Sequence, residues 1–463
     1  MFAKSLKVTV FFLLCLALVL GACAPAATVP APTAVVKEVE KTVVVTQIVQ
    51  SAPQVITATP QPTKDTSKDP VTLKFTTWTS NEAHLKMLNE IADAYKKDHP
   101  NVTVQFLSIP FADYGSKVTV QLAGGNPPDA GWLPEALSAS WIGAGVLADM
   151  APGLKSNQAY DFADFSTPAL RLWQAKDALY GIPFSNSPAF MVYNKDLFVK
   201  AGIDTPDILL KNGKWTWEAL AAAAKTIAEK NPGSYGYVYS DLYKTLHWAG
   251  MTPVMWAYGG GAWSDDGVQC QLDKPESVKA VQLMQDMIFK DKSMVPPGNE
   301  LNFQSGKVGM SIFILSGLGL LKDAAFKWDA VPLPSGPAGN TTYIGQAAIV
   351  VFNQSKNKAA ALDFAAFMTN KDNVAKFAAF FPPARKSVLA AGALMKSNAL
   401  VTENINKVIS DGIASGRTLP THAEFAKIDL AAKAEFDKLW KADANVQTVL
   451  TGACKAIAPF MNK

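Results

Sequence analysis

The chain contains little cysteine and carries little net charge. Four cysteines in 463 residues exclude a small fold that is stabilised mainly by disulfide bonds. The 43 basic and 39 acidic residues leave a formal net charge of +4, and no dense run of lysine or arginine is present. This balance argues against a nucleic-acid-binding protein. Hydrophobic residues make up 49% of the chain, which is ample for a large folded core and excludes a wholly disordered protein.

The sequence motifs of common catalytic and metal sites are also absent. There is no His-Glu-x-x-His, Gly-x-Ser-x-Gly, Cys-x-x-Cys or phosphate-binding-loop pattern. The four histidines are scattered along the chain, at positions 84, 99, 247 and 422. Segment 264–267 begins like a calcium-binding loop, but the rest of the ligand spacing fails, so a surface turn explains it better. We therefore expect no catalytic residue, no metal and no cofactor.

The apolar run near the N-terminus is too short to span a membrane. Lys4 and Lys7 precede an apolar stretch from Val8 to Leu20, and small residues follow, which is typical of a secretory signal peptide. The tetrad Leu-Gly-Ala-Cys that ends at Cys23 resembles the lipobox of bacterial lipoproteins. That resemblance implies a signal over residues 1–22, lipidation of Cys23 and an extracytoplasmic protein anchored to the cell membrane. The alternative is an ordinary secreted protein with a chance cysteine.

The segment after Cys23 has linker composition. From residue 24 to residue 70 it contains no aromatic residue and no glycine, but it contains seven prolines among Ala, Thr and Val. Such a composition favours an extended, semi-rigid tether, which we assign to residues 23–69. Its valine-rich middle, from Val35 to Val49, leaves a strand or a short assembly motif as the alternative.

Two cysteines, Cys270 and Cys454, remain for the folded part. They are far apart in sequence. In an oxidising compartment they could form a disulfide bond, and two separate buried thiols are an equally good interpretation.

The folded part begins near Val71 with alternating strands and helices. The pattern predicts strands over 71–78 and 102–109, with helices over about 82–99 and 112–122. Thr79 and Glu82 have the spacing of a capping box for the first helix. This alternation predicts an α/β fold with a mainly parallel sheet, in which ligands bind beyond the carboxyl ends of strands. Residues 78–81 and 132–135 fall at such ends.

Motifs of a known family occur in a fixed order through most of the mature chain. They are Tyr95–Pro100 before Val102–Val104, Ala123–Asp129, Leu179–Pro183, Tyr193–Phe198 with Ala201–Ile203, Lys214–Leu220, Phe303–Met310, Pro332–Pro334 and Asn357–Met368. This series resembles the extracellular solute-binding proteins of ABC importers, in the carbohydrate-binding group that includes maltose-binding protein. Thr216 is also a suitable N-cap, and Gly306 suits a turn, so these motifs have structural roles as well.

The resemblance implies a two-lobed periplasmic-binding-protein fold of type II. Each lobe would be a mainly parallel sheet flanked by helices, with a hinge between the lobes that closes on the ligand. We expect lobe 1 to comprise residues 70–183 and 330–372, and lobe 2 to comprise residues 184–329 and 373–463. The chain would cross between the lobes near 182–186, 330–334 and 370–375.

The implied function is capture of a carbohydrate, in particular an oligosaccharide, for delivery to an ABC importer. Sugars present C–H faces that suit aromatic rings and hydroxyl edges that need carboxylates, amides or arginine. The stretch from Tyr235 to Trp263 is rich in aromatic residues, of which Trp256 and Tyr258 are the first choices for stacking, although a core of aromatics would give the same pattern. Arg385 has a contact between the lobes or at a helix end as its alternative role. The expected ligand-binding residues are Trp78, Asn81, Trp132, Glu135, Asn186, Ser187, Asp241, Tyr243, Trp256, Tyr258, Tyr343, Gln346 and Arg385.

Several alternatives stay open. Segment 311–321 contains Phe313 but no tryptophan, where many sugar-binding relatives carry an aromatic residue, so the type of sugar is open. Another polar solute, such as glycerol phosphate, or a role as a ligand-presenting receptor for a sensor would fit the same fold. A secreted glycoside hydrolase would need two carboxylates about 5–10 Å apart, which a sequence cannot show. The expected partners are a small-molecule solute, the importer's membrane subunits and the membrane, with no nucleic acid and a monomeric state.

Overall fold

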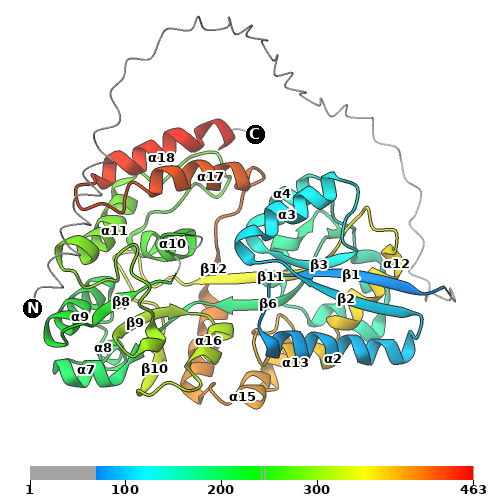
Figure 1. The fold of residues 1–463 in the computed structure, drawn as a ribbon, viewed down its shortest axis with the longest axis horizontal. Coiled ribbons are helices and arrows are strands. Elements are labelled where there is room, and N and C mark those ends of the chain that lie inside the picture. The colour runs from blue at the N-terminus through cyan, green and yellow to red at the C-terminus, as the bar shows by residue number, and fades with distance from the viewer. Residues whose placement is uncertain (1–68, 241, 245–246, 462–463) are drawn as a thin grey trace, which may run out of the picture. The chain divides into compact units, whose positions relative to one another are not determined.

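The computed structural model describes residues 69–240, 242–244 and 247–461 (Figure 1). The expected signal peptide, Cys23, the linker up to residue 68 and the expected ligand contact Asp241 lie outside the described residues. None of the helices in the described ranges has both the length and the apolar character that crossing a bilayer requires.

The first sheet has the strand order β12-β11-β3-β1-β2, and β6 also pairs with β11. Its strands are β1 (Val71–Thr77), β2 (Val102–Ser108), β3 (Ala130–Pro134), β6 (Ile182–Pro188), β11 (Tyr343–Val351) and β12 (Arg417–Thr418). Packed with it are α2 (Glu82–Asp98), α3 (Phe111–Ala123), α4 (Glu135–Gly143), α5 (Ala151–Ser156), α6 (Thr167–Leu170), α12 (Lys358–Met368) and the hairpin of β4 (Gln174–Ala175) and β5 (Ala178–Leu179). In β1, buried Leu73 and Phe75 alternate with exposed Thr72 and Lys74, the two-residue period of a strand. We call this sheet and its helices lobe 1.

The second sheet has the order β10-β7-β9-β8 and forms lobe 2 with its helices. Its strands are β7 (Phe190–Asn194), β8 (Tyr235–Val238), β9 (Val308–Phe313) and β10 (Trp328–Val331). Its main helices are α7 (Lys195–Ala201), α8 (Pro206–Lys211), α9 (Trp217–Lys230), α10 (His247–Tyr258), α11 (Pro275–Gln285), α16 (Glu403–Ser415), α17 (Phe425–Phe436) and α18 (Val446–Met461). Three short helices, α13 (Lys371–Phe377), α14 (Lys386–Ala390) and α15 (Ala393–Ser397), follow α12. The expected two-lobed α/β fold is therefore present.

Parallel pairs predominate in the first sheet, as expected, whereas antiparallel pairs predominate in the second. β1 pairs in parallel with β2 and β3, β11 with β12, and β8 with β9. In contrast, β11 runs antiparallel to β3 and β6, and β7 runs antiparallel to β9 and β10. β6 continues almost directly into β7, so one extended stretch of chain serves both sheets. Figure 1 shows β6 and β11 side by side between the two lobes.

The start of α2 also differs from the expectation. Asn81, and not Thr79, is the N-cap, because the Asn81 side chain accepts hydrogen bonds from two backbone N–H groups of the first helical turn. The Thr79 hydroxyl instead contacts the ring of His84 at 3.0 Å. Thr216 caps α9 as expected, since its hydroxyl accepts the backbone N–H of Ala219.

Core membership changes between the lobes at three places along the chain. Phe184 belongs to the lobe 1 core and Ala189 to the lobe 2 core. β11 begins with Tyr343 in the lobe 2 core and continues from Ala347 in the lobe 1 core. After α12, the neighbouring residues Phe377 and Ala378 fall in different clusters.

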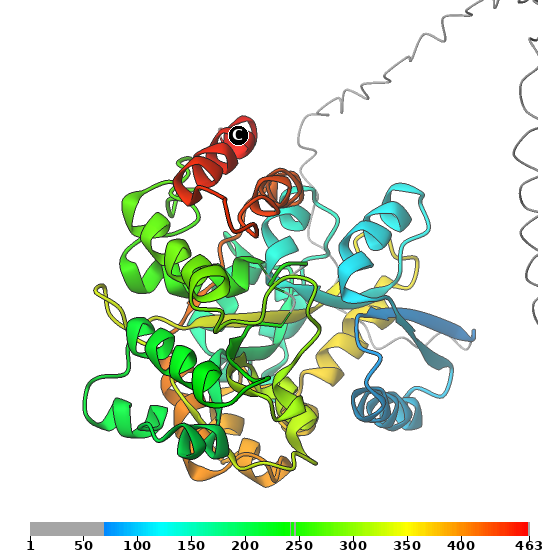
Figure 2. The same cartoon turned by 60° about the vertical axis from the view of Figure 1, so that its left-hand side comes forward.

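Cys270 and Cys454 form a disulfide bond, which decides the question that the sequence left open. Their Cα atoms are 5.5 Å apart, and the bond joins residues separated by 184 positions. It connects the loop before α11 to α18. The C-terminal helix α18 packs against α17 and also against α11 (Figure 2, C-terminal helices in red). The disulfide therefore holds the C-terminal helix on lobe 2.

Loss of this disulfide should weaken the fold. We expect the variant Cys270→Ala/Cys454→Ala to lose about 2–5 kcal/mol of unfolding free energy, because a long closed loop then gains conformational freedom in the unfolded chain. Denaturant unfolding of both proteins with and without dithiothreitol measures the loss. The reductant should not affect the variant. Identical curves for the oxidised and reduced wild-type protein would contradict the expectation.

Candidate functional site

Two neighbouring strands of lobe 1 end at the same edge of the sheet. Trp78 follows β1 directly and Glu135 follows β3, and these strands are parallel neighbours, so their carboxyl ends coincide. The ring of Trp78 lies edge-on to that of Trp132, with centroids 5.1 Å apart. Trp78 also contacts Phe111 and Tyr114. Trp78 remains half-buried, so it keeps some surface that a ligand can reach.

Trp132 lies beneath this edge and is fully buried. Its ring packs on Phe184 at 4.7 Å and on Phe381 at 5.8 Å. Its indole N–H has no hydrogen-bond partner among the described residues. A buried donor without a partner costs about 1–3 kcal/mol, so a partner from outside the chain would be favourable here.

A pair of buried amides lies where β6 and β11 cross between the lobes. Gln346 Nε2 donates to Asn186 Oδ1 at 3.0 Å, and the two residues are register partners. They are 3% and 4% exposed. Within the described ranges, Gln346 Oε1 accepts no hydrogen bond. Next to them, the hydroxyls of Ser185 and Ser187 bond to each other at 3.0 Å.

Glu135 connects the strand edge of lobe 1 to this pair. Burial raises the pKa of the Glu135 carboxyl to about 7, while hydrogen bonds from the backbone N–H groups of Glu135 and Gln346 favour the charged form. Burial also raises the pKa of Tyr343 to about 12, and the negative charge of Glu135 adds to this. The Tyr343 hydroxyl bonds to the hydroxyl of Tyr239 at 3.1 Å. Glu135, Asn186, Tyr343 and Gln346 therefore form one connected set, which we call the crossing cluster.

From lobe 2, Trp256 reaches the crossing cluster through Arg417. The Arg417 guanidinium lies over the Trp256 ring, 4.7 Å from its centroid. Arg417 pairs with Tyr343 in the β12–β11 register and has a 3.6 Å contact with Asp265. Its side chain is 53% exposed, whereas Trp256 is 8% exposed. A sugar that stacks on the covered face of Trp256 would take the place of Arg417.

Two other expected aromatic contacts lie elsewhere in lobe 2. The Tyr258 hydroxyl donates to Glu218, and Lys279 Nζ lies 5.3 Å from its ring centroid. The Tyr243 hydroxyl donates to the Val295 carbonyl at 2.7 Å. The structure thus gives both rings contacts within lobe 2 and does not place them in the crossing cluster. The Asn81 side chain is likewise occupied, because as the N-cap of α2 it accepts hydrogen bonds from backbone N–H groups.

Arg385 is fully buried, with its guanidinium occupied by the protein. Its nitrogens donate to the carbonyls of Tyr160, Asp161 and Thr369 at 2.8–3.0 Å. The carboxylate of Asp164 lies 3.5 Å away. The guanidinium carbon also lies 4.6 Å from the Tyr160 ring centroid. Since Arg385 directly precedes α14 and its partners belong to the lobe 1 side, these bonds favour its alternative role, a contact at a helix end or between the lobes.

Sequence reasoning missed two residues next to the crossing cluster, Tyr239 and Arg417. Tyr239 lies in the aromatic-rich stretch that the sequence singles out, but nothing distinguished it from its neighbours. Arg417 follows α16 in no recognisable motif, and only its pairing with β11 brings it to Trp256.

No metal site is evident in the described part of the chain, where no three His, Cys, Asp or Glu side chains gather suitably. The closest histidine–carboxylate pair is structural. His247 Nε2 lies 3.0 Å from Asp429 Oδ1, which also accepts the indole N–H of Trp248 at 2.7 Å. This pair connects α10 to α17.

Comparison with known proteins gives consistent matches. The sequence profile of a family described as bacterial extracellular solute-binding protein matches residues 90–403. A candidate binding protein of Brucella abortus is 28% identical over 306 residues, covering 62% of this chain and 69% of the relative. The arabinooligosaccharide-binding protein of Bacillus subtilis is 25% identical over 313 residues, covering 64% and 68%. An ABC substrate-binding protein of Listeria monocytogenes, solved in complex with cycloalternan, has a TM-score of 0.74 at 24% identity, covering 85% and 99%.

The Arg385 network predicts a pH-dependent stability. Burial raises the pKa of Asp164, but hydrogen bonds from Ser387 and the charges of Arg385 and Lys371 outweigh this and lower it. A carboxylate with a lowered pKa stabilises the fold above its unfolded-state value near pH 4, and this contribution is lost as the pH falls through the folded-state pKa. We expect Asp164→Asn to cost about 1.5–3 kcal/mol at pH 7 and progressively less below pH 4.

Denaturant unfolding between pH 3 and pH 8 measures this difference. Asp372→Asn is the matched control, because Asp372 is an exposed acid on neighbouring α13 and should change stability little. A cost for Asp164→Asn that stays constant across this pH range would contradict the assignment.

Proposed function

Because the chain belongs to the family of bacterial extracellular solute-binding proteins, we propose that it captures a carbohydrate, in particular an oligosaccharide, between its lobes and delivers it to an ABC importer. The site we propose is the crossing cluster together with Trp78 and Trp132 of lobe 1 and Trp256 of lobe 2. The named binding activity of the Bacillus subtilis relative, an arabinooligosaccharide-binding protein, supports a sugar as the ligand.

The observation that carries the proposal is the set of unused polar groups beside aromatic rings. The Trp132 indole N–H is a donor without a partner, and Gln346 Oε1 is an acceptor without one, among the described residues. Glu135 adds a carboxylate that burial destabilises. A sugar hydroxyl both donates and accepts, so it can satisfy groups of both kinds, while its C–H face suits an indole ring.

Charge in this region favours a neutral solute over a phosphate ester. Arg417 is the one cation that we find beside Trp256 in the described chain, and the carboxylate of Asp265 lies 3.6 Å from it. Glu135 would place a further negative charge near the ligand. A phosphate group calls for several unopposed Arg or Lys side chains. Glycerol phosphate therefore remains the second candidate, with Arg417 as its contact.

The lobes would close on the solute by a hinge at the three places where core membership changes. The sequence predicts lobes of 70–183 with 330–372 and of 184–329 with 373–463, but β10 belongs to the sheet of lobe 2 and the core clusters change at 184–189, 343–347 and 377–378, so we propose these three places as the boundaries. Closure is driven by the higher affinity of the closed form for the solute. The importer's membrane subunits then recognise that closed form. A sensor that reads the same form is the alternative partner.

We further propose that lipid on Cys23 anchors a monomeric protein outside the cytoplasm, with residues 23–69 as its tether. Two or more acyl chains on the mature N-terminus would give stable anchoring, where one would give only reversible binding. The protein would act as a binding protein without catalysis, since its family is one of solute-binding proteins.

A thermal-shift screen tests the ligand class. Arabino-oligosaccharides, maltotriose, lactose and glycerol phosphate are each added over a concentration series, and a sugar at 100 times its Kd should stabilise the fold by about 2.7 kcal/mol. Trp256→Ala should then weaken binding of that sugar about tenfold or more, through loss of the stacked ring. Trp328→Ala, which removes a tryptophan from edge strand β10, is the control and should bind normally.

Each outcome of the screen has a definite meaning. A shift with glycerol phosphate and with no sugar would replace the carbohydrate assignment. Equal affinity of the wild-type protein and Trp256→Ala would remove Trp256 from the site. Steady hydrolysis of a sugar in the screen would show an enzyme instead of a binding protein.

Glu135 should make solute binding depend on pH. Its pKa is about 7 in the folded protein, so the carboxylate forms as the pH rises through 7. A charged carboxylate accepts hydroxyl hydrogen bonds more strongly than a neutral one. We expect affinity to rise between pH 6 and pH 8 in isothermal titration, and to become both weaker and independent of pH in Glu135→Gln. A wild-type affinity that stays flat across this range would contradict the role of Glu135.

A further inference from the structure

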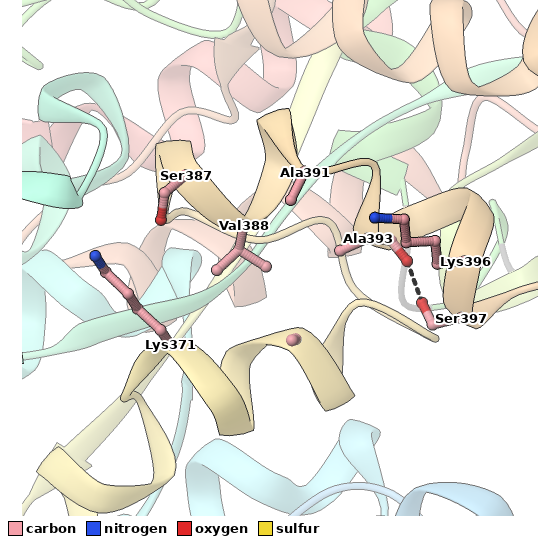
Figure 3. Close-up of a pocket in the computed structure, with 8 residues that line it drawn as sticks. Lys371, Ser387, Val388, Ala391, Ala393, Lys396 and Ser397 are labelled. Atoms are coloured by element: carbon pink, nitrogen blue, oxygen red, sulfur yellow. Dashed lines mark hydrogen bonds between the residues drawn. The ribbon is translucent and has the colours of Figure 1, made fainter.

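A pocket lies among the three short helices that follow α12. It has a volume of about 390 Å³ and lies between α13, α14 and α15 (Figure 3). Its lining is mainly apolar, and Lys371 and Lys396 lie at its two ends, with Val388 and Ala391 between them. We call it the α13–α15 pocket. Its residues are distinct from those of the proposed solute site.

This region has a local excess of basic side chains. Besides Arg385, which is buried and paired with Asp164, residues 371–397 contain four lysines and one acidic residue, although the whole chain has a formal net charge of only +4. Of the two lysines that line the pocket, Lys371 pairs with Asp161 at 2.8 Å. Lys396 is exposed and has no acidic partner in the described ranges. Met395 beside it is 40% exposed, so apolar and cationic surface adjoin.

The pocket lies on the seam between the lobes. Val388 and Ala393 belong to a core cluster with β7 and β9 of lobe 2. Two other residues of the pocket lining are bonded to lobe 1. Lys371 pairs with Asp161, and the Ser387 hydroxyl donates to Asp164 at 2.7 Å. A partner seated in the pocket therefore contacts side chains that both lobes hold in place.

We propose that the α13–α15 pocket is a docking surface for an acidic segment of the importer's membrane subunits, which places an apolar side chain in the pocket and carboxylates on Lys371 and Lys396. The proposal rests on the function proposed above, since it needs an importer as partner. Charge complementarity provides the attraction and orients the encounter. The apolar lining provides the contact that a partner side chain would bury.

A protein segment fits this surface better than a lipid bilayer does. Anionic lipids attract clustered lysines on a surface without needing a shaped apolar recess. A recess of this volume instead suits a discrete side chain from a folded partner. An arriving carboxylate would also compete with Asp161 for Lys371, so docking is coupled to the connection with lobe 1.

Binding to the cognate importer in phosphatidylcholine nanodiscs tests the proposal. We expect Lys396→Glu to weaken the affinity of the sugar-loaded protein about tenfold at low salt, with less effect at high salt. Ala391→Trp, which fills the pocket without changing charge, should weaken it similarly. Lysine in place of an acidic residue on an extracytoplasmic loop of the importer should restore the affinity of Lys396→Glu.

Matched controls separate the pocket from general effects. Ala390→Trp alters the neighbouring exposed residue of the same helix, and Lys200→Glu makes the same charge change on α7; both should bind the importer normally. Solute affinity should be unchanged in all four variants. If the wild-type protein itself binds no sugar, that result contradicts the proposed function and not the docking surface. Normal importer binding by both Lys396→Glu and Ala391→Trp would overturn the proposal. Loss of binding to phosphatidylglycerol vesicles, with importer binding intact, would identify the membrane as the partner and overturn it too.

Discussion

The antiparallel pairing of β6 with β11 is the interaction on which both lobes depend. These two strands carry the chain between the sheets, and each backbone hydrogen bond between them restrains the two lobes at once. β6 continues directly into β7 of lobe 2, while β11 extends the first sheet beside β3. The polar side chains of Asn186 and Gln346 are buried at this junction, where core membership along β11 changes from lobe 2 to lobe 1.

This junction explains the chemistry of the crossing cluster. Asn186 and Gln346 face each other because they are register partners, and burial at the same place raises the pKa of Glu135. Buried groups of this kind are costly unless they find partners. A solute with several hydroxyls can supply those partners, and its binding then favours the arrangement of lobes in which the groups converge. The same buried polar groups therefore destabilise the junction when they lack partners and provide the proposed contacts for the solute.

Features that depend on neighbouring residues could be predicted from the sequence, and features that depend on distant segments could not. Thr216 as a cap follows from local rules, because a cap acts within one helical turn, whereas the helix ending at Met368 was expected from the family resemblance. The strand ends at Trp78 and Glu135 were also predictable, because alternation along the chain locates them. Local pattern could not show that Tyr258 contacts Glu218 and Lys279, or that the partners of Arg385 come from segments distant in sequence. Each of these side chains suits a ligand equally well until its protein partners are known.

The sequence by itself determined the α/β class, the order of family motifs and the edge of lobe 1 where we propose ligand contacts, because these depend on short-range periodicity and spacing. The tertiary structure alone decided that Cys270 and Cys454 are joined, that the sheets are mixed and that Arg417 covers Trp256. The physical reason is that strand direction, disulfide pairing and cation–ring contacts depend on which distant segments pack together. That choice is made by burial of the whole chain, and no local stretch of residues contains it.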